Sequence, residues 1–145
     1  DLVRSRGLGD VYKRQALGVL PGTGGTQRLA RLVGRSRAIE LMVEGTKLGI
    51  TDALEEGIVN KVFEAESPEA FIKQVVAYAH RFCAPAGAPL AVGRIKRAVQ
   101  SGLDGSLEQG LALERELQAQ LFVSNDAKEG FAAFAEKRKP SFRGR

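Results

Sequence analysis

Three glycines within four positions form the part of this sequence with the most distinct chemical meaning. An apolar run over residues 16–20 is followed by Pro21 and by the turn 22–25, whose sequence is GTGG. Glycine at this density allows a sharp turn or a close approach to another group, where a Cβ would clash. If Thr26 caps a following helix, the first N–H groups of that helix favour an anion, a carbonyl oxygen or a polarised water. A tight strand-to-helix turn without any ligand is the alternative.

The turn lacks the residues of the common phosphate-binding loops. The phosphate loop requires a lysine and then serine or threonine after its last glycine, whereas Gln27 and Arg28 follow Thr26. The dinucleotide-binding fingerprint requires a glycine three residues after Gly24, where this chain has Gln27. The sequence therefore predicts neither a nucleotide-triphosphate loop nor a dinucleotide fold.

The turn instead resembles part of the enoyl-CoA hydratase/isomerase family, the crotonase superfamily. The similarity lies in LGVLPGTGGTQRLARLVGRSRAIELMVEG (17–45), in TDALEEGIVNKVF (51–63) and in AKEGFAAFAEKRK (127–139). It implies an α/β crotonase-like fold with a spiral core, of which this chain would be the mostly α-helical C-terminal half. On this interpretation residues 16–66 end the spiral core, and residues 67–145 form the helical region that builds trimers or dimers of trimers.

The same resemblance implies an activity, the hydration of 2-enoyl-CoA thioesters in fatty-acid or related acyl-CoA degradation. Coenzyme A enters as part of the substrate, and no other cofactor or metal is expected. Gly22 and Gly24 are the candidates for lining the acyl site. Phe134 and Lys137 match the aromatic residue and the lysine that cover the adenine end of a coenzyme A held by a neighbouring subunit. Isomerases, dehydratases and hydrolases of CoA thioesters are the alternatives within the family.

Residues 1–15 have no sustained apolar periodicity and differ in this from the rest of the chain. Residues 5–15 resemble the translation of a sequencing-adapter end, so we expect a non-native tail, with a natural disordered tail as the alternative. In the family, a Pro-Glu pair precedes the Leu-Gly of the glycine turn, which places its catalytic glutamate at Arg14. A guanidinium cannot act as an acid or base at neutral pH, and the family's second glutamate falls upstream of residue 1. We therefore expect this chain to have no catalytic residue and no hydratase activity.

Charge and cysteine usage narrow the possible partners. Of the net charge of +5, residues 1–15 contribute +2 and residues 137–145 contribute +5, which leaves −2 for the body of the chain. Because the basic residues sit at the two ends, a nucleic-acid surface is not expected. The single cysteine, Cys83, fits a reducing cytoplasm, and no apolar run is long enough for a membrane span. Cys83 is expected to be buried, and the lone His80 is not expected to bind a metal.

Apolar spacing and capping residues predict helices along the chain and one strand, Ile58 to Phe63. Caps are expected at Thr26, Ser36, Thr51, Ser67 and Ser106, and at Asn125 or Asp126. The predicted helices span residues 26–33, 35–44, 52–56, 67–84, 90–99, 106–123 and 125–139. The helix after Ser106 is apolar over half its circumference, which fits a subunit interface as well as a monomer core.

The basic residues 137–139 at the end of the last predicted helix have two interpretations. They are either a solvated C-terminus or a contact for the phosphates of coenzyme A. A function of a different class is also possible, namely a non-catalytic helical module whose basic tail binds anions such as nucleic acid. Such a module would show a steep salt dependence.

Overall fold

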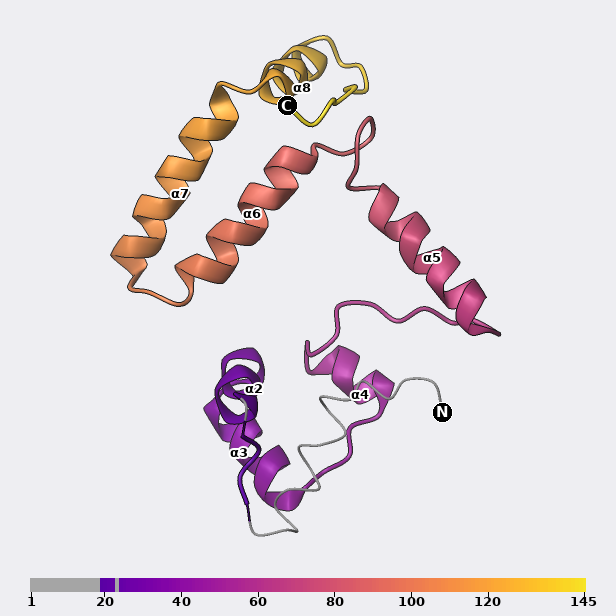
Figure 1. Cartoon of the computed structure of the whole chain (residues 1–145), viewed down its shortest axis with the longest axis vertical. Helices are drawn as coiled ribbons and strands as arrows, with labels where there is room; N and C mark the ends of the chain where they lie inside the picture. Colours follow the sequence, from indigo (N-terminus) through magenta and orange to yellow (C-terminus); the bar gives the residue numbers. More distant parts are fainter. Residues whose placement is uncertain (1–18, 23) are drawn as a thin grey trace. The chain divides into compact units, whose positions relative to one another are not determined.

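The computed structural model describes residues 19–22 and 24–145, and within them every regular element is an α-helix (Figure 1). The chain forms two compact units, the first ending at Pro68 and the second running from Glu69 to Arg145. The expected tail 1–15 and Arg14 lie outside the described residues. None of the described helices has both the length and the apolar character needed to cross a bilayer.

The described residues of the first unit form the glycine turn and three helices. Helix α2 (Gly25–Val33) packs against α3 (Arg35–Glu44), and α4 (Ile50–Glu55) follows. Ala38 and Leu41 of α3 are buried. After α4, Arg37 binds the Glu56 carboxylate through Nε at 2.5 Å and Glu40 of its own helix at 2.8 Å. The hydrogen bonds that Arg37 donates to Glu40 and Glu56 raise the pKa of Arg37, so the end of α4 is tied to α3 by a permanent cation.

The predicted strand from Ile58 to Phe63 is wrong. This segment has no regular structure, and the amides of Ile58 and Val59 both donate to the carbonyl of Ala53, at 2.9 and 3.1 Å. Those bonds continue the reversal that ends α4. A β-branched run becomes a strand only when another strand accepts its ladder hydrogen bonds, and the described residues contain none.

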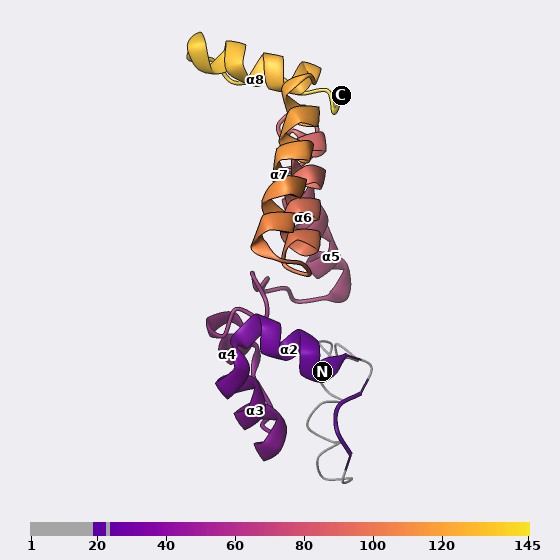
Figure 2. The same cartoon turned by 90° about the vertical axis from the view of Figure 1, so that its left-hand side faces the viewer.

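The second unit is a helical hairpin with a helix across its open end. Helix α5 (Pro68–His80) leads into α6 (Pro89–Gly102) and α7 (Leu107–Phe122), which lie side by side and antiparallel (Figures 1 and 2). A Cβ on Gly110 of α7 would come within 3.3 Å of the Gly102 carbonyl oxygen, so the absence of side chains lets the helices approach closely. Helix α8 (Asn125–Ala135) follows α7 and runs across the end of the hairpin (Figure 2).

Only some of the predicted caps are correct. The Ser106 capping box is confirmed, because Gln109 N donates to Ser106 Oγ at 3.2 Å and Ser106 N donates to Gln109 Oε1 at 2.9 Å. The caps predicted at Thr26, Ser36 and Thr51 are wrong. Helices α2 and α4 begin one and two residues before their predicted starts, and α3 begins at Arg35 as predicted, but the N-cap residues of all three are glycines: Gly24, Gly34 and Gly49.

Cys83 is exposed, which contradicts the expectation that it is buried. Helix α5 ends at His80, and the amides of residues 81, 82 and 83 donate to carbonyls three residues back instead of four. Cys83 therefore lies in this tightened turn and not on the apolar face of the longer helix that the sequence predicted.

Much apolar surface remains uncovered within the second unit. Leu117 is the buried residue of α7, whereas Leu107, Leu111 and Phe122 of the same helix are exposed. Ile95, Val99 and Leu103 along α6 and its C-terminal end are exposed as well. Exposed large apolar side chains in such number are typical of a protein interface.

Candidate functional site

The described residues of the glycine turn, Gly22, Gly24 and Gly25, lead into the start of α2. Gly24 is the N-cap of α2, with φ 88° and ψ 6°, and its carbonyl accepts from Arg28 N at 2.9 Å. Gly25 N donates to the Gly22 carbonyl at 3.3 Å, and a Cβ on Gly25 would lie 3.2 Å from Cβ of the buried Pro21. The predicted crowding is thus present. Gly22 and Gly24 can offer a ligand only backbone groups and the positive end of the α2 dipole.

The end of α8 has a different construction. Lys137 N donates to the Phe134 carbonyl at 3.2 Å, and Arg138 N donates to the Ala133 carbonyl at 3.0 Å. This pair of bonds is the Schellman motif, in which the residue after the C-cap adopts a left-handed conformation. Lys137 is that residue, with φ 54°, and it is the only non-glycine residue with positive φ in the described part of the chain.

A lysine at this position is unusual because glycine occupies it without steric cost. A left-handed conformation costs a residue with a Cβ roughly 1–2 kcal/mol. Strain of this kind is found mainly where a side chain is needed for function. Lys137 is exposed, and no described residue pairs with its ammonium group. Its charge is therefore available to a ligand.

Phe134 stands next to this cation. Phe134 is 86% exposed, which is exceptional for phenylalanine, and its carbonyl binds the Lys137 amide. Phe134 also borders a cavity of about 510 Å³ between α8, the C-terminal end of α7 and the start of α6. Phe122, Phe131 and Phe142 line the same cavity, and Phe122 and Phe131 stack with ring centroids 6.2 Å apart. The structure thus brings together the two predicted residues of α8 beside an aromatic cavity.

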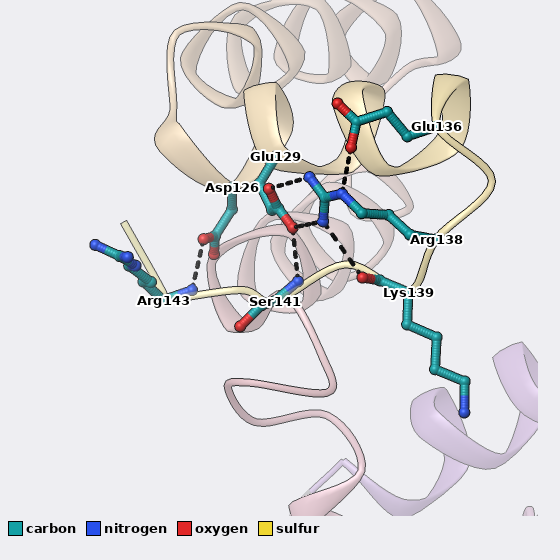
Figure 3. Close-up of polar contacts among 7 residues, drawn as sticks. All are labelled: Asp126, Glu129, Glu136, Arg138, Lys139, Ser141 and Arg143. Atoms are coloured by element: carbon teal, nitrogen blue, oxygen red, sulfur yellow. Dashed lines mark hydrogen bonds and ion pairs between the residues drawn. The ribbon is translucent and has the colours of Figure 1, made fainter.

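Two acids on α8 fasten the C-terminal segment to the helix (Figure 3). Asp126, only 5% exposed, accepts from Arg143 N at 2.7 Å and from Gly144 N at 2.8 Å. Glu129, one turn further along, accepts from Ser141 N at 2.8 Å and from both terminal nitrogens of Arg138, at 2.5 and 2.9 Å. The C-terminal segment, residues 138–145, is therefore held against α8.

Arg138 also changes the interpretation of the basic residues 137–139. Its Nε lies 2.5 Å from Glu136 Oε2, so two carboxylates neutralise it. The hydrogen bonds from Arg138 and then from Ser141 N lower the pKa of Glu129 from 4.5 to about 2, and the two acids raise the pKa of Arg138. Lys137 and Lys139 remain as cations, and the Lys139 side chain extends away from the acids (Figure 3). Arg138 is thus structural, whereas its two neighbours can bind an anion.

Sequence reasoning missed the role of the acids of α8 and assigned the N-cap of this helix to the wrong residue. Its N-cap is Ser124, whose Oγ accepts from Ala127 N at 3.1 Å, and not Asn125 or Asp126. Asp126 lies in the first turn and binds the C-terminal segment instead. The spacing of Asp126 and Glu129, which puts both on one helix face ahead of five basic residues, was the available signal.

Comparison with known proteins identifies the family. The sequence profile of the enoyl-CoA hydratase/isomerase family matches residues 12–145. The 2,3-dehydroadipyl-CoA hydratase of Escherichia coli K12 is 36% identical over 89% of this chain and 49% of its own length. A probable mitochondrial enoyl-CoA hydratase 2 of Arabidopsis thaliana is 39% identical over 88% of this chain and 41% of its own length.

A solved structure gives the same answer for the fold. The enoyl-CoA hydratase of Geobacillus kaustophilus HTA426 superposes with a TM-score of 0.78 at 45% identity, over 90% of this chain and 47% of the other. The chain therefore belongs to the enoyl-CoA hydratase/isomerase family, and the predicted crotonase-like fold is confirmed. The chain spans about half the length of the curated relatives that it matches.

Proposed function

We propose that the end of α8 binds the nucleotide part of coenzyme A, in a protein that acts on acyl-CoA thioesters. The observation that carries this proposal is the combination of a left-handed Lys137, which pairs with none of the described residues, with the exposed Phe134. An aromatic face can stack on adenine, and an ammonium group can pair with the phosphates. The left-handed backbone of Lys137 and the exposure of the apolar Phe134 ring to water each cost free energy, which binding of a ligand would offset.

The glycine turn has a second, separate role in the proposal. Gly22 and Gly24 line the acyl end of the substrate, where backbone can approach a thioester closely because no Cβ intervenes. The α8 residues instead serve a coenzyme A held by a neighbouring copy of the chain. In this proposal coenzyme A is part of the substrate, and the reaction uses no metal and no separate cofactor.

The reaction we propose for the whole protein is the hydration of 2-enoyl-CoA, with thioester isomerisation, dehydration or hydrolysis as the alternatives. Hydration requires a carboxylate that exchanges protons with water. Arg14 stands where the resemblance places that carboxylate, and a guanidinium cannot replace it. The 145-residue chain by itself is therefore inactive, although it keeps groups that bind the substrate.

We further propose that the full protein assembles as a trimer or a dimer of trimers in the cytoplasm. The support is the exposed apolar surface of α6 and α7, which a monomer of this chain leaves in water. Burying such surface contributes about 25 cal/mol per Å², so association is the favoured way to cover it.

Calorimetric titration tests the binding proposal. The 145-residue chain is titrated with coenzyme A and with 4′-phosphopantetheine, which lacks the adenine nucleotide. We expect coenzyme A to bind at least tenfold more tightly, because only the nucleotide meets Phe134 and Lys137. Equal affinities would refute the proposal. In the same preparation, hydration of crotonyl-CoA above the buffer rate would refute the claim that the chain is inactive.

A further inference from the structure

A second feature of α8 concerns how Lys137 is kept in its strained conformation. The reversal at Lys137 rests on two backbone hydrogen bonds, from Lys137 N to Phe134 O and from Arg138 N to Ala133 O. Helix ends fray readily, and a residue with a Cβ leaves the left-handed region unless its surroundings oppose this. The residue after the reversal must therefore be held in place by something other than the backbone.

Arg138 is the residue held, and Glu129 is what holds it. The guanidinium of Arg138 reaches back two turns to α8 and meets the Glu129 carboxylate through both terminal nitrogens, at 2.5 and 2.9 Å. Ser141 N binds the same carboxylate at 2.8 Å, so Glu129 joins the chain on either side of Pro140 to the helix. A two-pronged arginine–carboxylate pair fixes orientation as well as distance. Figure 3 shows the three groups converging.

We infer that Glu129 is a positioning residue, which clamps Arg138, holds the left-handed reversal at Lys137 and so keeps Lys137 and Phe134 in place for an anionic ligand. This inference rests on the proposed function, because it concerns the same residues at the end of α8. Glu129 does not itself touch the ligand. It acts through Arg138 on the backbone between Ala133 and Arg138.

For the Glu129→Gln substitution, electrostatics alone and a positioning role predict opposite changes in the affinity for an anionic ligand. The Glu129→Gln substitution removes one negative charge from a neighbourhood that already holds Lys137 and Lys139, so attraction of an anion should increase. Positioning predicts that the same substitution weakens binding, because the binding-competent conformation becomes a minor one. Apparent affinity falls in proportion to the populated fraction, and a fraction near one tenth gives about tenfold weaker binding.

Glu136 provides a matched control on the same helix end. Its carboxylate also contacts Arg138, through Nε at 2.5 Å, but its side chain is 60% exposed and it binds no residue of the segment beyond Arg138 in the described contacts. Glu136→Gln removes the same charge without releasing the two-pronged pair or Ser141. We expect its affinity for coenzyme A to be unchanged or slightly raised.

The experiment combines titration with hydrogen exchange on the full 145-residue chain. Wild type, E129Q and E136Q are titrated with coenzyme A, and amide exchange at Lys137 and Arg138 is followed by NMR. We expect E129Q to bind about tenfold more weakly and to exchange both amides about tenfold faster, while E136Q resembles wild type. Unchanged exchange in E129Q would overturn the inference whatever the affinities are, and so would faster exchange with unchanged or tighter binding.

Two further results keep this outcome separate from the proposed function. If wild type does not bind coenzyme A, the proposed function fails, whereas the exchange data still decide whether Glu129 holds the reversal. If far-UV circular dichroism shows that E129Q is unfolded, R138K decides instead, since lysine keeps the charge and loses the fork. R138K should then show faster exchange at Lys137 and weaker binding, and wild-type behaviour would overturn the inference.

Discussion

The start of α2 and the end of α8 both pass through a left-handed residue, and they use different residues to do so. Gly24 has φ 88° at the N-cap of α2, where it has no side chain to offer a ligand. Lys137 has φ 54° after α8, beside an exposed Phe134. Glycine also fills the left-handed positions that end α3 and α4, Gly45 and Gly57. This chain therefore uses glycine at the turns where only geometry matters, and it accepts strain at Lys137, the residue that we propose binds a ligand.

The two regions also differ in what supports them. The glycine turn is fixed by hydrogen bonds within five residues of one another and by the buried Pro21. The reversal at Lys137 is held by a pair of residues nine positions apart, Glu129 and Arg138. The glycine turn should therefore be insensitive to substitutions elsewhere in the chain, whereas the reversal at Lys137 can be disrupted by a substitution at Glu129. Substitutions at each end should therefore have effects of different kinds.

The largest effect is expected at the glycine turn. Gly24→Val places a β-branched side chain at φ 88°, with its Cβ 3.3 Å from Arg28 Nε, and should destabilise the first unit by about 2 kcal/mol. Urea unfolding measures the change. Gly93→Ala is the control, because Gly93 lies inside α6 with nothing within 4 Å of the added Cβ. Gly93→Ala should stabilise the chain by about 0.5–1 kcal/mol. A similar loss of stability in Gly24→Val and Gly93→Ala would contradict this account.

The next effect separates binding from stability at the end of α8. Phe134→Ala removes a ring that is 86% exposed, so the unfolding midpoint should hardly change, while coenzyme A should bind about tenfold more weakly through lost stacking of about 1–3 kcal/mol. Phe131→Ala should lower the unfolding midpoint and leave the affinity for coenzyme A nearly unchanged, because the Phe131 ring stacks on Phe122. Calorimetric titration and thermal unfolding of both variants make the test. Equal effects of the two substitutions on affinity would show that Phe134 has no special role.

How far the sequence alone could predict these features depends on the range of the interactions. The glycine turn and the Ser106 capping box are predictable because their determinants lie within four residues. The strand at 58–63 is mispredicted because β-branched residues indicate a strand only when a partner strand exists. Cys83 is predicted on a helix face that in fact ends three residues before it. The cap of α8 is misplaced because three consecutive residues, Ser124 to Asp126, are all good caps, and the contacts of Asp126 with Arg143 and Gly144 decide between them.

The roles of Arg138 and Lys137 are beyond sequence reasoning for the same reason. The basic residues 137–139 are chemically alike in the sequence, and only their three-dimensional partners distinguish them. Glu129 and Glu136 neutralise Arg138, whereas Lys137 occupies the left-handed position and its ammonium group pairs with no residue in the described part of the chain. The family resemblance names Phe134 and Lys137 as candidates, and that assignment stays a prediction until binding is measured.

A smaller, local effect is expected from pH. The pKa of Glu129 is lowered from 4.5 to about 2, so its contribution to holding the C-terminal segment is complete above about pH 4.5 and is lost as the pH falls towards 2. Carboxyl carbon shifts of Glu129 in an NMR titration measure this directly. In Arg138→Gln the pKa should return towards 4.5, because the largest cause of the shift is removed. A normal pKa for Glu129 in the wild-type chain would show that the clamp does not form in solution.

The most direct test of the central claim is the Lys137→Gly substitution, with thermal unfolding and coenzyme A titration performed on the same samples. Glycine relieves the left-handed strain at φ 54°, so stability should rise by about 0.5–1 kcal/mol. The lost ammonium group should at the same time weaken coenzyme A binding about tenfold. Opposite changes in stability and affinity are the predicted result. A variant that becomes more stable and binds coenzyme A as well as wild type would contradict the claim that Lys137 is kept for its side chain.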